Sequence, residues 1–541
     1  MEYAKQPMVM SDYDRFWTKY CGVLDISMEQ FMAIQQALLL RQLQEVARCP
    51  LGTRLIGKKI PASVDEFRES VPLTTYNDYL PDLTEGNEDS LLEKPYIWAH
   101  TTGSSGFKQV PYTLQFYNQV LDNLMAVFIL ACSNKRGRSS IGNGDRVLFN
   151  VAPAPYMSGI LAHGASERFN LRGVVPPDLH DGMDFKEKMA QGFEVSLQTG
   201  VDILIALTSV LVKMGNDFNN HSKNGKLSKH LLHPNVLYRC GRAWLQSKLQ
   251  KRSMLPKDLW PVKAVIGWGI DTNIYRDLVY KYWGSYPYEF HACTEAGIIA
   301  MQSWNKRDMT FIPHSNFFEF IPETEWLESK RNSSYQPRTV LLSEVKPGEC
   351  YELVITSFYR MPFIRYRLGH LIRITSLEDE EARIRLPQMV FEARADDLID
   401  IAGFTRISER TVAQAIANSG LSCEEWSIRK EVKQGKPTLH LYMELNNKHQ
   451  PAEVASIMDE QLKNLDGFYY DLGSMMDIHP LEVTKLRPGT FKDYYAKKAG
   501  AELHERKPPR MNASDDVIGE LLSLDSRAGQ KYEVALKDVA S

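Results

Sequence analysis

The sequence has few cysteines, and they form no pattern that indicates a bridge or a metal site. Its 541 residues include seven cysteines and no CxxC pair, so the spacing predicts neither a disulfide framework nor a zinc site. The first residues have no apolar core of a signal peptide. The longest apolar run, Leu124 to Cys132, is too short to span a bilayer. These absences predict a protein of the reducing cytoplasm without a membrane partner.

Charge of one sign is not in excess either. The formal net charge is −3, and 43% of the residues are hydrophobic and 24% charged, as in ordinary globular proteins. There is therefore no electrostatic reason to expect nucleic acid or an anionic membrane as a partner. The length is sufficient for two unequal domains.

The most distinctive stretch is a short run of hydroxyl-bearing residues and glycines that is followed by a lysine. The run consists of Thr101, Thr102, Gly103, Ser104, Ser105 and Gly106, and the lysine is Lys108. Glycine lets the backbone approach a bulky anion, and consecutive N–H groups in such a loop form a concave anion site. The GxxxxGK[ST] spacing of the P-loop is absent. The stretch predicts a phosphate-binding loop, with a solvated turn between two strands as the alternative.

Short apolar runs alternate with helical patterns in the first half of the chain. The runs are Arg146 to Ala152, Asp202 to Ala206, Lys263 to Gly267 and Tyr288 to His291. Buried runs with helices between them predict a parallel α/β sheet. Ligands of such sheets bind at the carboxyl ends of the strands. In this chain Gly267, Gly269 and the segment Ala292 to Glu295 lie at those ends.

From Thr310 to Phe391 the pattern changes to closely spaced strands. These strands are Phe317 to Ile321, Thr339 to Ser343, Tyr351 to Ile355 and Leu371 to Ile374. They predict an antiparallel, barrel-like sheet that completes a large α/β domain over residues 1–394. Beyond it, one alternating strand and two helical patterns predict a smaller α+β domain over residues 395–541.

The hydroxyl–glycine loop resembles the phosphate-binding loop of the adenylate-forming superfamily of acyl-CoA synthetases, peptide-synthetase adenylation domains and luciferases. A second stretch, His291 to Glu295, resembles the aromatic-Gly-x-Thr-Glu motif of that superfamily. The resemblance implies that His291 and Ala292 lie beside adenine. It also implies that Thr294 binds a phosphate and that Glu295 binds magnesium, a hard cation that prefers carboxylate ligands. The structural alternative is that Glu295 caps a following helix.

Two further stretches resemble motifs of the same superfamily. Arg365 to His370 resembles Tyr-Arg-x-Gly-Asp, in which the aspartate binds both ribose hydroxyls. His370 stands at that position, and a neutral histidine can accept only one such hydrogen bond. Phe391 to Gly403 resembles the interdomain hinge, which implies that Arg394 reaches ribose or phosphate and that the small domain pivots about Asp396. A surface salt-bridge cluster is the alternative.

The C-terminal segments resemble one branch of the superfamily, the acyl acid amido synthetases known from plant auxin and jasmonate conjugation. They are Arg487 to Phe491, Tyr494 to Gly500 and Glu505 to Arg510. On this resemblance the chain is similar to a divergent, bacterial-like member with the adenylate-forming fold. Lys507 falls at the position of the catalytic lysine.

We therefore expect an AMP-forming ligase that uses ATP and Mg2+. It would convert a small carboxylic acid to an acyl-adenylate and then transfer the acyl group to an amino acid, with Lys507, Thr294 and Glu295 as catalytic residues. A carboxylate–CoA ligase similar to phenylacetate–CoA ligase, with CoA as acceptor, is one alternative. A non-catalytic protein that binds a nucleotide or an acid on the same fold is the other, since a fold does not imply a function.

Overall fold

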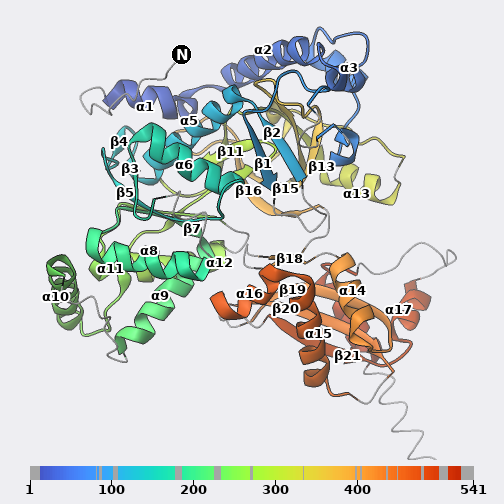
Figure 1. Ribbon diagram of the computed structural model, residues 1–541. Helices are drawn as coiled ribbons and strands as arrows, with labels where there is room; N and C mark the ends of the chain where they lie inside the picture. The colour runs from blue at the N-terminus through green and yellow to red at the C-terminus, as the bar shows by residue number, and fades with distance from the viewer. Residues whose placement is uncertain are drawn as a thin grey trace, which may run out of the picture. The chain divides into compact units, whose positions relative to one another are not determined.

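The structure, a computed structural model, divides the chain into two compact units, Met1–Ala395 and Asp396–Ser541, here the first and second unit (Figure 1). It describes residues 13–80, 82–83, 88–101, 108–176, 185–223, 233–268, 272–332, 334–395, 399–401, 405–407, 409–433, 436–446, 449–476, 480–498 and 510–525. Within these ranges, none of the helices combines the length and the hydropathy that crossing a bilayer requires.

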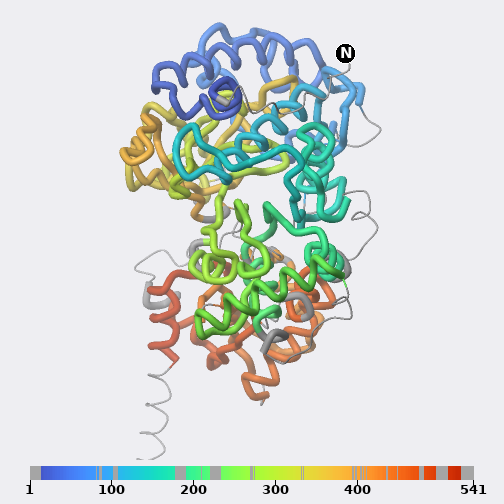
Figure 2. The backbone as a smooth tube through the Cα atoms, turned by 90° about the vertical axis from the view of Figure 1, so that its left-hand side faces the viewer, coloured from blue at the N-terminus to red at the C-terminus, as the bar shows by residue number. Residues whose placement is uncertain are grey.

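Helices form the start of the first unit, and a reciprocal cap begins α2 (Met28–Val46). Ser27 Oγ accepts a hydrogen bond from the N–H of Gln30, and Gln30 Oε1 accepts one from the N–H of Ser27, which satisfies two backbone donors. α2 packs on β13 (Asn316–Pro322), where Gln35 Oε1 accepts from the N–H of Phe318 at 2.9 Å. Figure 2 shows the N-terminal helices in blue at one end of the first unit. The other elements here are α1 (Tyr13–Cys21), η2 (Gly22–Asp25), α3 (Pro50–Ile56), α4 (Val64–Ser70) and η3 (Tyr76–Tyr79).

A hairpin of β1 (Ile97–Thr101) and β2 (Lys108–Tyr112) flanks the hydroxyl–glycine stretch. Thr101 and Lys108 are register partners, so the stretch connects two adjacent antiparallel strands. Thr113 caps the buried helix α5 (Leu114–Ala131), and its Oγ1 accepts from the N–H of Phe116 at 3.1 Å. A small hairpin of β3 (Ser133–Lys135) and β4 (Arg138–Ser139) follows.

A five-stranded parallel sheet confirms the predicted α/β class. Its order is β6-β5-β7-β8-β9, and every neighbouring pair is parallel. The strands are β5 (Arg146–Asn150), β6 (Arg172–Gly173), β7 (Ile203–Leu207), β8 (Ala264–Trp268) and β9 (Pro287–Tyr288). The helices between them are α6 (Met157–Phe169), α8 (Phe185–Thr199), α9 (Thr208–Lys223), α10 (Pro234–Leu249), α11 (Pro256–Leu259) and α12 (Thr272–Trp283). Core strands of this sheet are buried on both faces, which explains their continuous apolar runs.

The antiparallel sheet that the second strand pattern predicts is also present. Its seven strands have the order β10-β11-β12-β16-β15-β14-β13. Besides β13, they are β10 (Phe290–Cys293), β11 (Gly297–Gln302), β12 (Met309–Phe311), β14 (Cys350–Ser357), β15 (Tyr366–Ser376) and β16 (Gln388–Arg394). Helix α13 (Glu323–Arg331) connects β13 to the segment before β14.

Two predicted strands differ from the structure. The run Tyr288 to His291 is divided, because β9 joins the parallel sheet whereas β10 joins the antiparallel sheet. Glu289 lies between them, and its N–H donates to the side-chain oxygen Oε1 of Gln302 at 2.8 Å instead of to a backbone carbonyl. The run Thr339 to Ser343 makes only a bridge from Val340 to β13 before η4 (Leu342–Glu344) begins.

The second unit contains a three-stranded sheet with helices. β19 (Cys423–Lys433) and β20 (Lys436–Leu445) are antiparallel, and β20 and β21 (Leu481–Leu486) are parallel. The remaining elements are the hairpin β17 (Ile399–Ile401) and β18 (Thr405–Ile407), then α14 (Glu409–Ser419), α15 (Pro451–Leu465), α16 (Gly467–Met476), α17 (Thr490–Lys498) and a helix over residues 515–525. This is the α+β content that the alternating and helical patterns predict.

Candidate functional site

A lysine, a carboxylate and a phenol from three distant segments meet beside the hydroxyl–glycine stretch. Lys108 Nζ, at the start of β2, lies 3.4 Å from Glu295 Oε1 and 3.3 Å from the hydroxyl of Tyr366. That hydroxyl donates to the same Glu295 oxygen at 3.3 Å. Lys108 Nζ also lies 5.1 Å from the ring centroid of Tyr76. We call Lys108, Glu295 and Tyr366 the charged cluster; it places a cation and an anion next to the predicted phosphate loop.

Backbone contacts fix the turn that contains Glu295. The carbonyl of Thr294 accepts from the buried Tyr112 hydroxyl at 2.9 Å, and the carbonyl of Glu295 accepts from Ser357 Oγ at 3.3 Å. The next element is strand β11, which begins at Gly297, so the alternative that Glu295 caps a helix is wrong. Gly297 has φ +67°, and a Cβ there would lie 2.6 Å from a methyl group of Val120. The turn is thus held rigidly, and Glu295 is presented with only 8% of its surface exposed.

Two imidazoles form a second polar group. His291 Nε2 on β10 lies 3.0 Å from His370 Nδ1 on β15. His291 is stacked on Phe391 of β16, with ring centroids 5.0 Å apart and planes 25° apart, and His370 meets Phe391 edge-on. Burial lowers the pKa of His291 to about 4, so this ring is neutral at pH 7. Its tautomer therefore decides which of the two facing nitrogens donates.

The histidine contact shows that the antiparallel sheet is strongly curled. β10 and β15 are four places apart in the strand order, which in a flat sheet is about 19 Å. Side chains of His291 and His370 can touch only if the sheet bends around its concave face, as in a barrel. The curl brings the chain segments of both predicted motifs together.

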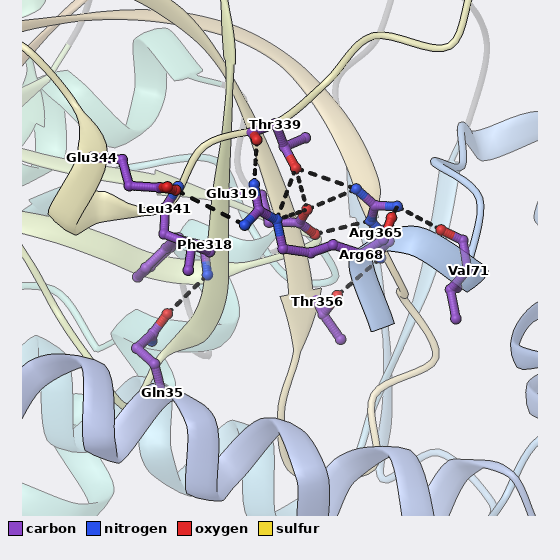
Figure 3. Close-up of polar contacts among 10 residues, drawn as sticks. All are labelled: Gln35, Arg68, Val71, Phe318, Glu319, Thr339, Leu341, Glu344, Thr356 and Arg365. Carbon is purple, nitrogen blue, oxygen red and sulfur yellow. Dashed lines mark hydrogen bonds and ion pairs between the residues drawn. The ribbon is translucent and has the colours of Figure 1, made fainter. Parts of the chain in front are cut away.

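A buried ion pair supports the start of β15 (Figure 3). Arg365 Nε and Nη2 donate to the two carboxylate oxygens of Glu319 at 3.0 and 2.7 Å, and Nη1 donates to the carbonyl of Val71 at 2.5 Å. Thr339 Oγ1 donates to Glu319 as well, at 2.6 Å. Glu319 is fully buried, so the pair is satisfied on all sides rather than open to a ligand. It positions the residue before Tyr366; the sequence contains no local signal for this partner 46 residues away.

Among the predicted residues at the parallel strand ends, Gly267 has a packing reason to be glycine. A Cβ there would lie 2.7 Å from Thr208 Oγ1. That hydroxyl is 3.0 Å from Thr272 Oγ1 and donates to the carbonyl of Trp268 at 3.3 Å. The carboxyl ends of β7 and β8 are therefore joined by hydroxyl contacts.

One titratable residue was missed from the sequence. Glu289 lies between β9 and β10, is hydrogen-bonded to Thr272, and its Oε1 is buried without a hydrogen-bond partner among the described residues. Burial raises its pKa to about 7, against the opposing effect of Arg276. The available signal was a glutamate between the buried Tyr288 and the half-buried Phe290 of a predicted strand.

The described residues include part of the predicted site. Thr101 ends β1, and its hydroxyl is buried and has no partner within the described ranges. Ala292 lies at a bulge between β10 and β11. Arg394 is in β16, and its backbone pairs with that of His370 in β15. The side chain of Arg394 lies outside the described part of the structure. Outside the described residues lie Thr102, Gly103, Ser104, Ser105, Gly106, Gly269, Asp396 and Lys507.

No group of three or more His, Cys, Asp or Glu side chains suited to a metal occurs in the described part of the chain. A single carboxylate can still bind magnesium that is shared with phosphate oxygens. Glu295 fits that role, because the contacts of Lys108 and Tyr366 are to Oε1.

Comparison with known proteins identifies relatives along most of the chain. Residues 22–169 match the GH3 family N-terminal domain, residues 309–394 the central domain, and residues 408–516 the C-terminal domain. A jasmonoyl–L-amino acid synthetase of Oryza sativa subsp. japonica is 21% identical, over 85% of this chain and 89% of that protein. An indole-3-acetic acid-amido synthetase of Oryza sativa subsp. indica is 30% identical, but the match covers 40% of this chain and only 36% of that protein.

Solved structures with the same fold cover nearly the whole chain. The GH3.15 acyl acid amido synthetase in complex with 2,4-DB aligns with a TM-score of 0.54 at 18% identity, over 96% of this chain and 97% of that one. A 2-hydroxyisobutyryl-CoA ligase in complex with 2-HIB-AMP and CoA aligns with a TM-score of 0.55 at 15% identity, over 89% and 90%. These alignments establish the shared adenylate-forming fold.

Proposed function

This chain belongs to the GH3 family, and from that premise we propose that it is an acyl acid amido synthetase that adenylates a carboxylic acid and transfers the acyl group to an amino acid. The observation that carries the proposal is the charged cluster. It places Lys108 and Glu295 at the end of the hydroxyl–glycine stretch, where a triphosphate and its cation need neutralising groups.

The reaction consists of two displacements. A carboxylate oxygen attacks the α-phosphorus of ATP, the bond to the bridging oxygen breaks, and pyrophosphate leaves with that electron pair. The amine of an amino acid then attacks the acyl carbonyl; the amide bond forms, the bond to the AMP oxygen breaks, and the amine loses a proton to solvent. The protein contributes alignment and charge neutralisation in both steps.

Each described residue of the site has a role in this proposal. Thr101 and the hydroxyls and glycines that follow it bind the β- and γ-phosphates, and Lys108 neutralises phosphate charge. Thr294 adds a hydroxyl to the same group. Glu295 binds Mg2+, which supplies charge stabilisation when bound. When the phosphates bind, Lys108 moves its contact from Glu295 to an anion of higher charge.

The nucleoside lies against the histidines in this proposal. The stacked rings of His291 and Phe391 give a flat apolar surface next to Ala292, which suits adenine. His370 Nδ1 faces His291, so Nε2 is the one ring nitrogen of His370 that could accept a hydrogen bond from a ribose hydroxyl. Gly267, Gly269 and Arg394 complete the nucleotide contacts.

Lys507 is proposed as the catalytic lysine of the adenylation step, on its place in the C-terminal motif of the family. Between the two half-reactions, a rotation of the second unit about Asp396 would move Lys507 out of the site and let the acceptor enter. The family match also favours an amino acid over CoA as acceptor. The CoA ligase is kept as a second candidate because its fold aligns equally well.

A two-part assay tests the proposal. Purified protein with Mg-ATP and a panel of carboxylic acids, aromatic and aliphatic, should release pyrophosphate with at least one acid. Adding amino acids should then give an amide and AMP, whereas CoA should have no effect. A thioester product would establish the CoA ligase. Absence of pyrophosphate release together with tight ATP binding would establish a binding protein.

A further inference from the structure

Helix α10 exposes a row of large apolar side chains. Five of them are between 54% and 77% exposed: Leu237, Tyr238, Trp244, Leu245 and Leu249. Leu237, Trp244, Leu245 and Leu249 are spaced by seven, one and four residues, so they share one face of the helix, while Val236 and Ala243 are buried on the other. In Figure 1, α10 stands at the outer edge of the first unit, beyond α8 and α11. Such a contiguous exposed face marks an interaction surface.

The sequence around this helix is strongly basic although the chain as a whole is not. Residues 218–257 contain no aspartate or glutamate, in a protein of net charge −3. The cations in this stretch are Lys223, Lys226, Lys229, Arg239, Arg242, Lys248, Lys251, Arg252 and Lys257. The apolar face is thus accompanied by charge of one sign, which favours an anionic partner.

A pocket of about 230 Å³ at the flank of α10 collects three guanidinium groups, from Arg146, Arg239 and Arg242. Arg146 makes a bidentate pair with Asp202, at 2.8 and 3.0 Å. The nearby carboxylate of Asp258 is paired with Arg252 instead. Three guanidinium groups therefore face one carboxylate, and the pocket has an excess of two positive charges.

Donors of this pocket remain available. Arg239 uses Nη1 for the carbonyls of Leu197 and Gln198, and Arg242 uses Nη2 for the carbonyls of Asp258 and Leu259. Within the described residues, the Nε and the second Nη of both arginines have no hydrogen-bond partner. A planar fork of free N–H groups is suited to phosphate oxygens.

We propose that α10 docks the protein on an anionic phospholipid surface, with a lipid phosphate in the arginine pocket and the apolar side chains of α10 inserted between lipids. Tyr238 lines the pocket and is itself 71% exposed, so the two features are continuous. Trp, Tyr and Leu with Lys and Arg beside them are the composition of helices that lie in a membrane interface. A second copy of this chain is a poorer occupant, because two basic helices would repel each other.

The docking surface is separate from the proposed reaction site. Arg146 begins β5 and Asp202 directly precedes β7, so the pocket lies at the amino ends of the parallel strands. Gly267 and Trp268 lie at the opposite, carboxyl end of β8. A bound lipid would leave that end open, and variants of α10 can be compared at unchanged activity.

Co-sedimentation with vesicles tests the proposal. The full chain should bind phosphatidylcholine vesicles that contain phosphatidylserine, should not bind pure phosphatidylcholine, and should bind less as salt rises. Removing two pocket charges in an Arg239→Gln, Arg242→Gln variant should weaken binding roughly twentyfold. A Trp244→Ser, Leu245→Ser variant should weaken it about tenfold or more through lost insertion.

Helix α13 offers a matched control. There Trp326 and Leu327 are adjacent, and Lys330 Nζ lies 4.8 Å from the Trp326 ring, as Lys248 Nζ lies 5.9 Å from the ring of Trp244. Trp326→Ser, Leu327→Ser should bind vesicles like wild type, and thermal unfolding confirms that each variant folds. Three results would overturn the proposal: no binding to the anionic vesicles, equal loss in the control, or a dimer that Trp244→Ser, Leu245→Ser converts to a monomer while vesicles stay unbound. Inorganic phosphate that binds in calorimetry without any vesicle binding would assign the pocket to a free anion instead.

Discussion

His291 and His370 face each other across the curled antiparallel sheet, with Nε2 and Nδ1 3.0 Å apart. Each imidazole therefore uses one nitrogen for the other, and Phe391 packs against both rings. The pair lies where the superfamily resemblance expects adenine and ribose contacts. Its protonation is thus coupled to folding and, in the proposed site, also to nucleotide binding.

The pH dependence of stability should report on His291. Its pKa is about 4 in the folded protein and about 6.5 when unfolded, so the unfolded state binds more protons between these values. The stabilising effect is complete above pH 6.5 and is lost as the pH falls toward 4. Between pH 7 and pH 5 the free energy of unfolding, measured with urea, should fall by about 2 kcal/mol more in wild type than in His291→Phe. His314, whose pKa burial also lowers to about 4, remains in both proteins as the internal control. An identical loss in wild type and variant would mean that His291 is not buried as described.

His370→Asp should tighten ATP binding. A carboxylate has enough acceptor sites for His291 and for both ribose hydroxyls, whereas His370 Nε2 can accept from only one hydroxyl. The variant therefore adds one hydrogen bond worth about 0.5–1.5 kcal/mol, or about tenfold in affinity at most. Calorimetric titration with Mg-ATP measures the change. His314→Asn is the matched control, because that ring contacts Asn123 rather than the site. An unchanged dissociation constant in His370→Asp would place the ribose elsewhere.

Glu289→Gln should stabilise the protein at high pH and change little at low pH. The pKa of Glu289 is raised from 4.5 to about 7 by burial, so the folded state binds more protons in that window and stability is lost as the pH rises through it. A glutamine carries no charge and keeps a partner for Thr272. The stability of Glu289→Gln relative to wild type, measured as the free energy of unfolding, should rise by on the order of 2 kcal/mol between pH 5 and pH 8. A gain that is equal at both pH values would contradict the raised pKa.

Glu295→Gln should reduce pyrophosphate release by about a hundredfold or more, because an amide is a weak magnesium ligand. Initial rates at saturating Mg-ATP measure the effect. Glu325→Gln, which removes a carboxylate that pairs with Arg338 at the surface, is the control and should keep wild-type turnover. Full activity of Glu295→Gln would remove this residue from the magnesium site.

Lys507→Ala should suppress adenylation while ATP still binds. A catalytic lysine on the second unit acts on the transition state more than on the ground state. Pyrophosphate exchange should therefore fall steeply while the dissociation constant for Mg-ATP stays within about twofold of wild type. Lys485→Ala and Lys492→Ala are the comparison variants. If one of them loses adenylation and Lys507→Ala does not, the other lysine performs the step.

Local patterns in the sequence determined the class of the fold. Apolar runs such as Asp202 to Ala206 predicted buried parallel strands correctly. Such predictions are possible because the hydrophobic pattern that distinguishes a strand from a helix is contained within a single segment. The short motif around Glu295 was recognisable for the same reason, since its residues are contiguous. The run Tyr288 to His291 shows the limit, because a continuous pattern does not reveal that a chain passes from one sheet to another at Glu289.

Only the tertiary structure decided which distant side chains meet. Lys108, Glu295 and Tyr366 are separated by 187 and 71 residues, and their contact depends on the packing of β2 beside the antiparallel sheet. The same is true of the histidine pair, which exists because the sheet curls. The buried charge of Glu319 pairs with Arg365 at 2.7 Å and with Arg68 at 3.8 Å, and sequence spacing encodes neither pairing. The periodicity of the sequence indicates which face of an element points to the core. The degree of burial of a side chain, its pKa and its partners depend on the contacts between elements.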